Sequence, residues 1–568
     1  MMKSKGRLAA LLKKKILVLD GAMGTELHKR GLPAGVCPEA WCLDHPEAPA
    51  AIHGAYRKAG ADGVYTATFG ANRKKLECYG VTDVFGMNRA LARIAREAVG
   101  PEAFVIGDIS STGHFVEPFG DLPFAEAVAN FREQAEGLLA GGVDGFVIET
   151  MIDIQEARAA LIAVREVSQL FTIVSMTYEK NGRTLNGTDP LTALVALQAL
   201  GADAVGCNCS AGPEAMLEMI GRMKPYATVP LLAKPNAGLP ELIGEETIFG
   251  MGAANFASFG PAFAKAGVNL MGGCCGTTPD HIAALAKNLA AAQPVAPVRR
   301  SLAAASSARQ SLVLEGGGPL ALIGSRMNLA ENETLRQTVA AGEVGPLRQA
   351  VREQDKEGAA LLQLKMMAPG LDERETLARV LTQIAPTTRL PLLIDVERIA
   401  GVEGVLRRYP GRVLVRMAGP GEDAEDLLAA AAQYGAVPVL RCRPEAGTTL
   451  CRAEIRRIVA AARPCGFTKE GIVIDLSPAG ALPTAAATKT ALGLIGWCAE
   501  QVGCPTLLDL TAIGRERPER PWLQAALLAA AQTAGLTLAI ADPALAELKQ
   551  IRQAGDLFRG RTSSANHH

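Results

Sequence analysis

The chain has 568 residues, a length that favours two to four domains over one. Its 58 basic and 58 acidic side chains give a formal net charge of zero without long blocks of one sign, which excludes the usual footprint of a nucleic-acid-binding protein. No apolar run is long enough for a membrane span, and the N-terminus lacks an apolar signal core, which indicates a cytoplasmic protein without a membrane partner. In that compartment the 12 cysteines are expected to be ligands or core residues.

The first half of the chain alternates short apolar runs with helix-like segments. The runs are 16–21, 63–69, 104–110, 145–149, 171–177, 204–209, 230–234 and 268–272. Eight such units in just under 300 residues predict a (β/α)₈ barrel over residues 1–292. In that fold reactive groups gather at the C-terminal ends of the strands, where Asp20, Glu149, Cys209 and Asn236 fall.

Two cysteines, Cys274 and Cys275, stand in a glycine-rich turn directly after the last of these runs. Glycines at 272, 273 and 276 permit the distortion that lets adjacent side chains converge on one point. Cys209, at the end of the sixth run, is the best third ligand. Three cysteines without a fourth protein ligand indicate a zinc site of the catalytic kind, which holds a substrate thiol as thiolate. The alternative is that these cysteines are small buried apolar residues.

Residues 293–318 are rich in Pro, Ala, Ser and Gly and predict an interdomain linker. The alternation then resumes, with runs at 320–323, 360–364, 390–396, 413–417, 436–440, 471–476, 505–510 and 536–541. We therefore predict a second (β/α)₈ barrel over 319–560 and an overall α/β fold of two consecutive TIM barrels. Residues 561–568 form a tail whose two histidines resemble a truncated purification tag.

The first half closely resembles the homocysteine S-methyltransferase domain. The motifs that carry the resemblance are Asp20-Gly21-Ala22-Met23-Gly24-Thr25-Glu26-Leu27, Thr68-Phe69-Gly70-Ala71-Asn72, Glu149-Thr150-Met151-Ile152-Asp153, Asn208-Cys209-Ser210, Lys234-Pro235-Asn236-Ala237-Gly238-Leu239-Pro240 and Gly272-Gly273-Cys274-Cys275-Gly276. The resemblance implies Zn²⁺ held by Cys209, Cys274 and Cys275, with the sulfur of homocysteine as fourth ligand. It also implies that Asp20, Glu149 and Asn236 orient the amino acid part of homocysteine.

The second half resembles the pterin-binding barrel that follows this domain in cobalamin-dependent methionine synthase. The matching segments are Ile323-Gly324-Ser325-Arg326-Met327-Asn328, Ala368-Pro369-Gly370-Leu371-Asp372-Glu373, Pro391-Leu392-Leu393-Ile394-Asp395 and Tyr434-Gly435-Ala436. The remaining candidates for cofactor binding are Asn328, Asp395 and Asp475.

Several pterin-binding positions of that family carry other residues in this chain. Gln363-Leu364-Lys365, Asp395-Val396 and Arg416-Met417 stand where the family has Asp-Val-Asn, Asp-Ser and Asn-Ser. Each buried ligand group left unpaired costs about 1–3 kcal/mol, so we do not expect methyltetrahydrofolate to bind in the usual way. Lys365, Arg416 and further arginines lie at these strand ends. They fit either a mouth for an anionic ligand or acidic partner, or a scaffold whose arginines pair with Asp395, Glu397, Asp475 and Asp509.

The methyl donor stays open at this point. We favour a methylcorrinoid such as methylcobalamin because of the two-barrel arrangement. Because no cobalamin-binding signature follows the second barrel, we expect it to arrive on a separate corrinoid protein or as free cofactor. The alternatives are S-methylmethionine, methyltetrahydrofolate as in a methionine synthase core, and a non-enzymatic role as docking subunit of a corrinoid methyl-transfer system.

Overall fold

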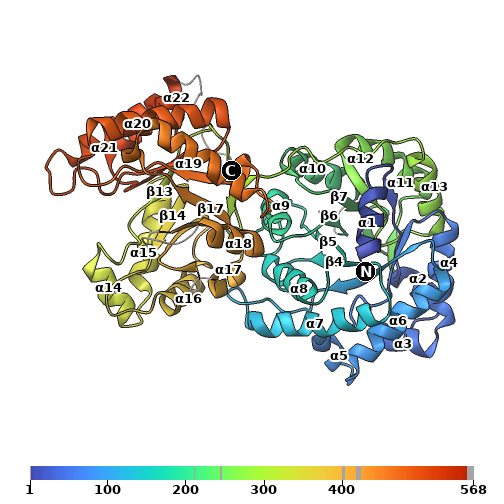
Figure 1. Cartoon of the computed structure of the whole chain (residues 1–568). Coiled ribbons are helices and arrows are strands. Elements are labelled where there is room, and N and C mark those ends of the chain that lie inside the picture. Colours follow the sequence, from blue (N-terminus) through green and yellow to red (C-terminus); the bar gives the residue numbers. More distant parts are fainter. Residues whose placement is uncertain (1, 210–211, 244–245, 400–402, 418–423, 559–568) are drawn as a thin grey trace. The chain divides into compact units, whose positions relative to one another are not determined.

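A computed structural model describes residues 2–209, 212–243, 246–399, 403–417 and 424–558 of the chain (Figure 1). The chain divides into two compact units, Met1–Arg299 and Arg300–His568. Each unit contains an eight-stranded parallel sheet surrounded by helices, and the prediction of two consecutive TIM barrels is confirmed. All the predicted strands are present, with bounds within a few residues of the apolar runs.

The first barrel is built from β1 (Leu17–Val18), β2 (Gly63–Tyr65), β3 (Phe104–Ser110), β4 (Gly145–Met151), β5 (Phe171–Met176), β6 (Ala204–Asn208), β7 (Leu231–Lys234) and β10 (Val268–Met271). The strands follow one another around the sheet, β10 lies between β7 and β1, and a bridge from Leu19 to Gly63 joins β1 to β2. The C-terminal ends of all eight strands therefore face one mouth, where loops can gather functional side chains.

Helices cover the outside of the first barrel. They are α2 (Gly24–Lys29), α3 (Pro38–Asp44), α4 (Glu47–Lys58), α5 (Arg73–Glu77), α6 (Val84–Val99), α7 (Phe124–Ala140), α8 (Ile154–Val167), α9 (Pro190–Ala199), α10 (Pro213–Met223), η1 (Lys224–Tyr226), α11 (Ala253–Ser258), α12 (Gly260–Ala266) and α13 (Pro279–Leu289). A further helix, α1 (Met2–Leu11), brings Leu8 into contact with the inward-facing Phe104 and Ile106 of β3. The N-terminal end of the barrel is thus filled with apolar side chains.

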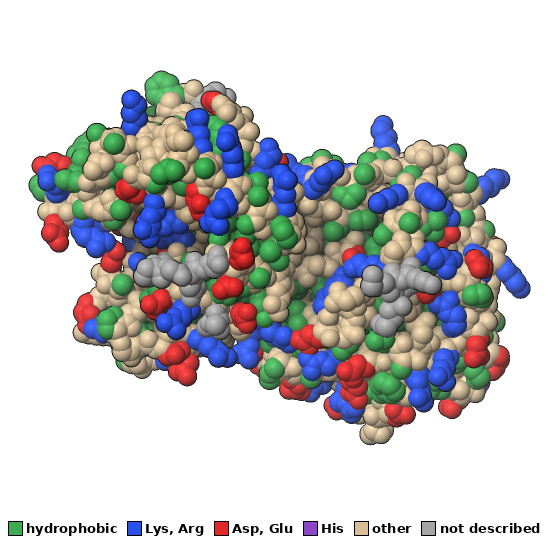
Figure 2. Space-filling view, in the orientation of Figure 1, with side chains coloured by type: hydrophobic (Ala, Val, Ile, Leu, Met, Phe, Trp, Pro, Cys, Tyr) green, Lys and Arg blue, Asp and Glu red, His purple; other side chains and the backbone are tan. Residues whose placement is uncertain are grey.

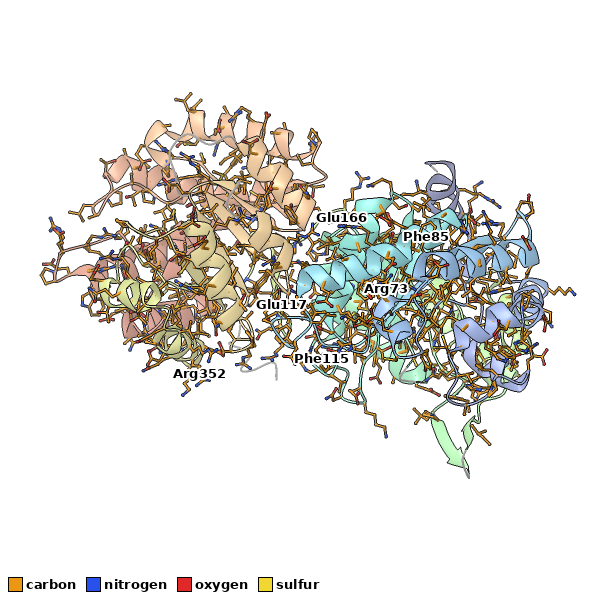
Figure 3. The ribbon with its side chains drawn as sticks, turned by 90° about the horizontal axis from the view of Figure 1, so that it is seen from below. Arg73, Phe85, Phe115, Glu117, Glu166 and Arg352 are labelled. Carbon is orange, nitrogen blue, oxygen red and sulfur yellow. The ribbon has the colours of Figure 1, made fainter. Side chains whose placement is uncertain are left out.

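A hairpin, β8 (Pro240–Ile243) and β9 (Glu246–Phe249), leaves the mouth of the first barrel between β7 and β10 (Figure 3). Its base is tied to the cysteine turn, because Met251 N–H donates to the Ala237 carbonyl and Ala237 N–H donates to the Cys275 carbonyl, both at 3.0 Å. The apolar-run pattern did not reveal this hairpin, which belongs to a loop and not to the barrel.

The second barrel is a closed ring of β13 (Ala321–Gly324), β14 (Leu361–Lys365), β15 (Leu392–Val396), β16 (Leu414–Met417), β17 (Val437–Arg441), β18 (Val473–Asp475), β19 (Thr506–Asp509) and β20 (Leu538–Ala541). Its helical segments are α14 (Glu333–Ala340), α15 (Gly345–Lys356), α16 (Glu373–Ile384), α17 (Glu403–Arg408), α18 (Ala424–Tyr434), η3 (Pro444–Ala446), α19 (Thr448–Ala462), η4 (Lys469–Gly471), α20 (Ala485–Trp497), η5 (Cys498–Val502), α21 (Arg520–Ala534) and α22 (Ala546–Phe558).

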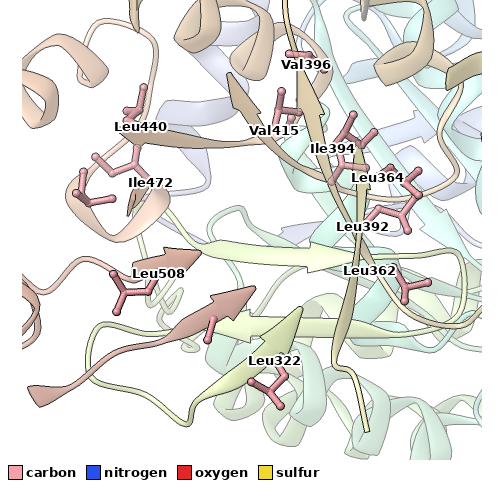
Figure 4. Close-up of a cluster of buried hydrophobic side chains, with 14 of the residues drawn as sticks. Leu322, Leu362, Leu364, Leu392, Ile394, Val396, Val415, Leu440, Ile472 and Leu508 are labelled. Carbon is pink, nitrogen blue, oxygen red and sulfur yellow. The ribbon is translucent and has the colours of Figure 1, made fainter. Parts of the chain in front are cut away.

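Strand side chains of the second barrel alternate between two cores, as period 2 requires. Leu362 and Leu364 of β14 point outward and pack with Ile394 of β15 beneath the helices (Figure 4). Leu361 points inward, into a separate cluster within the ring. By the same alternation Gln363 lies inside the barrel, nearer its mouth. Gln363, one of the substituted pterin-binding positions, is therefore an interior group.

Part of the expected linker is folded. Residues 303–314 form a hairpin of β11 (Ala303–Ser306) and β12 (Ser311–Leu314), and its Ala303, Ala305 and Leu314 join the inner cluster of the second barrel. The buried Arg412 fixes the hairpin by donating to the Leu302 carbonyl at 2.6 Å. The hairpin fills the N-terminal end of the second barrel, as α1 does in the first.

The surface mixes charges of both signs. In the face shown in Figure 2, Lys and Arg side chains are interspersed with Asp and Glu side chains, in accordance with the zero net charge. Among the described residues, no helix is both long and apolar enough to cross a membrane.

Candidate metal and substrate site

The three predicted ligand cysteines meet at the mouth of the first barrel. The Sγ atoms of Cys209, Cys274 and Cys275 all lie within 4.8 Å of one another, with 3.9 Å between Cys209 and Cys275. Cys209 follows β6 in a left-handed conformation, with φ of 60°, which turns its thiol out of the strand's alternation. Within the described residues this is the one group of His, Cys, Asp and Glu side chains with metal-binding spacing.

Backbone and amide hydrogen bonds hold the cysteine turn. Cys274 N–H donates to the Pro235 carbonyl at 2.8 Å, and Cys275 N–H donates to Asn236 Oδ1 at 3.1 Å. Gly276 has φ of +78°, and a Cβ there would lie 2.3 Å from Cβ of Phe249, so only glycine fits. The turn is therefore built between β7 and the base of the hairpin.

A buried amide orients the strand ends below the thiols. Asn208 Nδ2 donates to Thr150 Oγ1 at 2.7 Å, and Asn208 Oδ1 accepts from Thr150 N–H at 2.9 Å and from Ser175 Oγ at 2.7 Å. Thr150 has φ of 58°, so a second non-glycine residue beside the cysteines is left-handed. Such conformations persist only where neighbouring groups hold them, and the two hydrogen bonds with Asn208 hold Thr150.

The donor set fits zinc. Three sulfur ligands with an open fourth position are the arrangement of a zinc site that accepts a substrate ligand. Hydrogen bonding with Cys209, together with burial, raises the pKa of Cys275 to about 12. Hydrogen bonding with Cys209 and with Cys275, together with burial, raises the pKa of Cys274. Crowded thiols resist ionising together, and a bound cation would reverse this by stabilising the thiolates.

A cavity of about 280 Å³ opens beside the thiols. Its polar walls include Asp20, Glu39, Tyr65, Asp108, Glu149, Lys234, Cys274 and Cys275, and its apolar walls include Met23, Leu27 and Phe69. The cavity is thus large enough for a small amino acid, and both ionisable and apolar groups line it.

Two of the predicted substrate-binding residues line this cavity. Asp20 Oδ1 accepts from Lys234 Nζ at 2.9 Å, and its Oδ2 accepts from Tyr65 N–H at 2.7 Å. Burial opposes the charged form of Lys234, but Asp20 and Glu149 outweigh it and raise the Lys234 pKa. Burial raises the pKa of Glu149 to about 7, partly offset by Lys234. The ammonium of Lys234 also lies 3.5 Å from the Tyr65 ring centroid.

The third predicted substrate-binding residue, Asn236, has a different position. It is absent from the cavity walls, and its Oδ1 is bonded to Cys275 N–H. The structure therefore gives Asn236 a role in positioning the cysteine turn. Asp108, Tyr65 and Lys234 are lining residues that sequence reasoning had not assigned to the site. A signal for Asp108 exists in the sequence, because it is an acidic residue at an inward position of the apolar strand β3.

In the second barrel, the candidate cofactor-binding residues Asp395 of β15 and Asp475 of β18 both face Arg416 of β16. Arg416 donates Nε to Asp395 Oδ1 at 2.8 Å and Nη2 to Asp395 Oδ2 at 2.6 Å. It also donates to Asp475 Oδ2 at 3.3 Å and to Asp509 Oδ2 at 3.0 Å. Burial acts to raise the pKa of Asp509, but Arg416 and Thr511 outweigh it and lower that pKa.

The other oxygens of these carboxylates are also bonded. Asp475 Oδ1 accepts from Ser477 N–H at 2.9 Å, and Asp509 Oδ1 accepts from Thr511 Oγ1 at 2.6 Å. The third candidate, Asn328, uses its Oδ1 for the backbone N–H of Ala330 at 3.1 Å. These residues do not fit a pterin, because the guanidinium of Arg416 already takes the carboxylate oxygens that a pterin ring would need.

Comparison with known proteins agrees with this geometry. Residues 17–289 match the family model described as homocysteine S-methyltransferase, a match that spans the first barrel. The chain is also 29% identical over 467 residues to a methionine synthase of Mycobacterium tuberculosis, an alignment that covers 77% of this chain and 39% of that protein. It spans about 40% of the length of the curated methionine synthases that it matches.

Two solved structures are each similar to about half of the chain. The oxidised homocysteine methyltransferase MmuM of Escherichia coli is 26% identical, covers 48% of this chain and 96% of its own, and gives a TM-score of 0.41. A dihydropteroate synthase of Xanthomonas albilineans is 19% identical, covers 46% of this chain and 98% of its own, and gives a TM-score of 0.36.

Proposed function

We propose that the first barrel transfers a methyl group to the thiol of homocysteine and forms methionine at a zinc ion held by Cys209, Cys274 and Cys275. The observation that carries the proposal is the convergence of these three thiols beside a cavity walled by buried carboxyl groups. Bound there, zinc supplies the Lewis acidity that keeps a substrate thiol ionised at neutral pH.

The protein's own residues prepare this reaction by orientation. Asn236 and the Pro235 carbonyl hold the cysteine turn in place, with Cys274 and Cys275 lining the cavity. Glu149 and the Asp20–Lys234 pair orient the charged groups of the amino acid. Fixing these groups beforehand converts binding into a near-attack arrangement.

The transfer itself needs no proton from the protein. The substrate sulfur supplies the electron pair of the new sulfur–carbon bond, and the donor keeps the pair of the bond that breaks. The apolar walls at Met23, Leu27 and Phe69 limit water around the reacting methyl group.

A methylcorrinoid is the donor that we favour, on a separate protein or free, because Arg416 already bonds the described carboxylates that would hold the pterin of methyltetrahydrofolate. S-methylmethionine is the second candidate. The 12 cysteines, three of them proposed ligands, require a reducing compartment, which supports a cytoplasmic location.

The test is methionine formation by zinc-loaded protein from L-homocysteine with methylcobalamin, S-methylmethionine, or methyltetrahydrofolate plus cob(I)alamin. Turnover with methylcobalamin supports the favoured donor, and turnover with the folate couple would contradict the assignment of the second barrel. The alternative of a non-enzymatic docking subunit requires that none of the donors supports turnover.

Two variants connect activity to the thiols. Cys275→Ala should lose both stoichiometric zinc, measured by elemental analysis, and activity. The matched control is Cys207→Ala, because the buried Cys207 thiol lies 3.9 Å from Met223 Sδ, outside the cavity walls, although it is only two residues from Cys209. Full activity of Cys275→Ala would refute the zinc mechanism.

A further inference from the structure

Asp108 is a buried carboxylate in the substrate cavity that the proposed function has not used. It lies on β3, where Phe104 and Ile106 point into the barrel, and the alternation of the strand points Asp108 the same way. Its side chain is 4% exposed and lines the same cavity as Cys274 and Cys275. Among the described residues, no group lies within hydrogen-bond distance of its Oδ1.

The backbone of Asp108 is fixed. Its N–H donates to Thr66 Oγ1 at 2.9 Å, and its carbonyl accepts from Thr68 Oγ1 at 2.7 Å and from Gln134 Nε2 at 3.3 Å. The backbone that carries the carboxyl group is thus held by Thr66 and Thr68, which follow β2, and by Gln134 of α7. A carboxyl group held this firmly, with a buried oxygen left unbonded, is preorganised for a partner that the protein does not supply.

The charges around the cavity show what kind of partner this is. Asp20, Glu39, Asp108 and Glu149 are four buried carboxyl groups, and Lys234 is the one basic side chain among the cavity's walls. Lys234 is bonded to Asp20, which leaves Asp108 and Glu149 without a bonded cation among the described residues. Burial, together with the nearby Glu149, raises the pKa of Asp108, as expected for a carboxyl group without a counter-charge. A cationic ligand group would relieve this imbalance.

We propose that Asp108 is a further substrate-binding residue, whose carboxylate accepts a hydrogen bond from the α-ammonium group of the thiol amino acid. The assignment rests on the proposed function, because homocysteine brings both a thiol for the cysteine cluster and an ammonium group for Asp108. It makes Asp108 a specificity residue that selects an amino acid thiol over a thiol without an amino group.

The experiment compares the binding of L-homocysteine and of 4-mercaptobutanoate, which lacks the amino group, to zinc-loaded protein by calorimetry. Both probes carry the same thiol, so the contribution of the metal cancels between them. Asp108→Asn should lower the affinity for homocysteine about 10- to 100-fold, the range for a lost charge-assisted hydrogen bond. It should leave the affinity for 4-mercaptobutanoate unchanged. The matched control is Ser110→Ala on the same strand, because Ser110 is buried with an unbonded hydroxyl but does not line the cavity. It should bind both probes as the wild type does.

A second readout separates binding from structure. Because Asp108→Asn removes an uncompensated buried charge, the ligand-free variant should melt at or above the wild-type temperature, whereas loss of a structural residue would lower it. Asp108→Ser serves the same purpose should the asparagine variant not fold.

The outcomes are distinct. Equal wild-type affinity for the two probes, or unchanged homocysteine preference in Asp108→Asn, overturns the assignment of Asp108 while leaving methyl transfer intact. Absence of homocysteine binding to the wild-type protein overturns the proposed function and, with it, the role of Asp108.

Discussion

Arg416 and Asp395 form a two-pronged ion pair at the mouth of the second barrel, with hydrogen bonds of 2.8 and 2.6 Å. The two residues are register partners on the adjacent strands β15 and β16, so the pairing follows directly from the closure of the barrel. Gln363, on the strand before them, donates to Asp395 at 2.6 Å. The polar layer of this barrel is therefore bonded within itself, which favours the interpretation of a scaffold whose arginine pairs with its aspartates.

Arg416→Met should destabilise the second barrel strongly. It leaves Asp395, Asp475 and Asp509 buried without their counter-charge, and breaking a buried pair from one side costs about 3–5 kcal/mol. Urea unfolding followed by circular dichroism at pH 7 measures the loss. The control is Arg457→Met, which removes an exposed i,i+3 pair with Glu454 and should change stability by less than about 1 kcal/mol. Equal effects of the two substitutions would show that the network contributes nothing.

The ion pair between Arg416 and Asp509 predicts that stability depends on pH. The pKa of Asp509 is lowered in the folded protein, so its stabilisation by Arg416 is present above the unfolded carboxyl pKa, near 4, and is lost as the pH falls through the folded value. The stability gap between wild type and Arg416→Met should therefore narrow below about pH 4. A gap that stays constant down to pH 3 would contradict this account.

Asn208→Ala should weaken zinc binding without removing a ligand, although Asn208 Nδ2 also donates to Cys274 Sγ at 3.9 Å. The substitution removes three hydrogen bonds to Thr150 and Ser175, which hold the left-handed Thr150 and the end of β6 directly before Cys209. Loss of the buried amide should cost about 1–3 kcal/mol of stability, and the zinc affinity should fall about 10-fold or more, as with other residues that orient metal ligands. Competition with a chromogenic chelator measures the affinity. An unchanged affinity in a folded variant would show that the cysteines position themselves.

The fold and the metal cluster were largely predictable, because both depend on local patterns. Apolar runs of strand length gave all sixteen barrel strands, and glycines around Cys274 and Cys275 marked the turn. The hairpin at 303–314 was not predicted, because its Ala-rich sequence resembles a linker. Its alanines are buried only because the hairpin packs into the open end of a barrel. The bonding of Asn236 and Asp108 was also beyond the sequence, because it depends on distances across strands that no spacing encodes.

His53 predicts acid sensitivity of the first barrel. Its side chain in α4 is fully buried, and neither ring nitrogen has a hydrogen-bond partner among the described residues. Burial lowers its pKa to about 4, so between about pH 4 and 6.5 the unfolded state binds more protons than the folded state. Stability should therefore fall as the pH falls through this window, by about 2 kcal/mol between pH 7 and pH 5. His53→Leu should remove this part of the dependence, measured as urea midpoints at the two pH values. A variant that loses as much stability as the wild type would assign the acid sensitivity to other groups.

Lys234 and Asp20 should be strongly coupled in stability. Both side chains are 3% exposed, and each is the other's charged partner at 2.9 Å. Lys234→Met leaves a buried carboxylate and should cost about 3–5 kcal/mol, because the desolvation of Asp20 is no longer offset. Asp20→Asn should likewise be destabilising, since it leaves the buried ammonium with a neutral neighbour. The double variant should be more stable than the sum of the single losses predicts, and a coupling energy above about 1 kcal/mol in a double-mutant cycle is expected for residues in direct contact. Additive losses would mean that other groups compensate each charge. For Lys234 that group would be Glu149, which also raises its pKa.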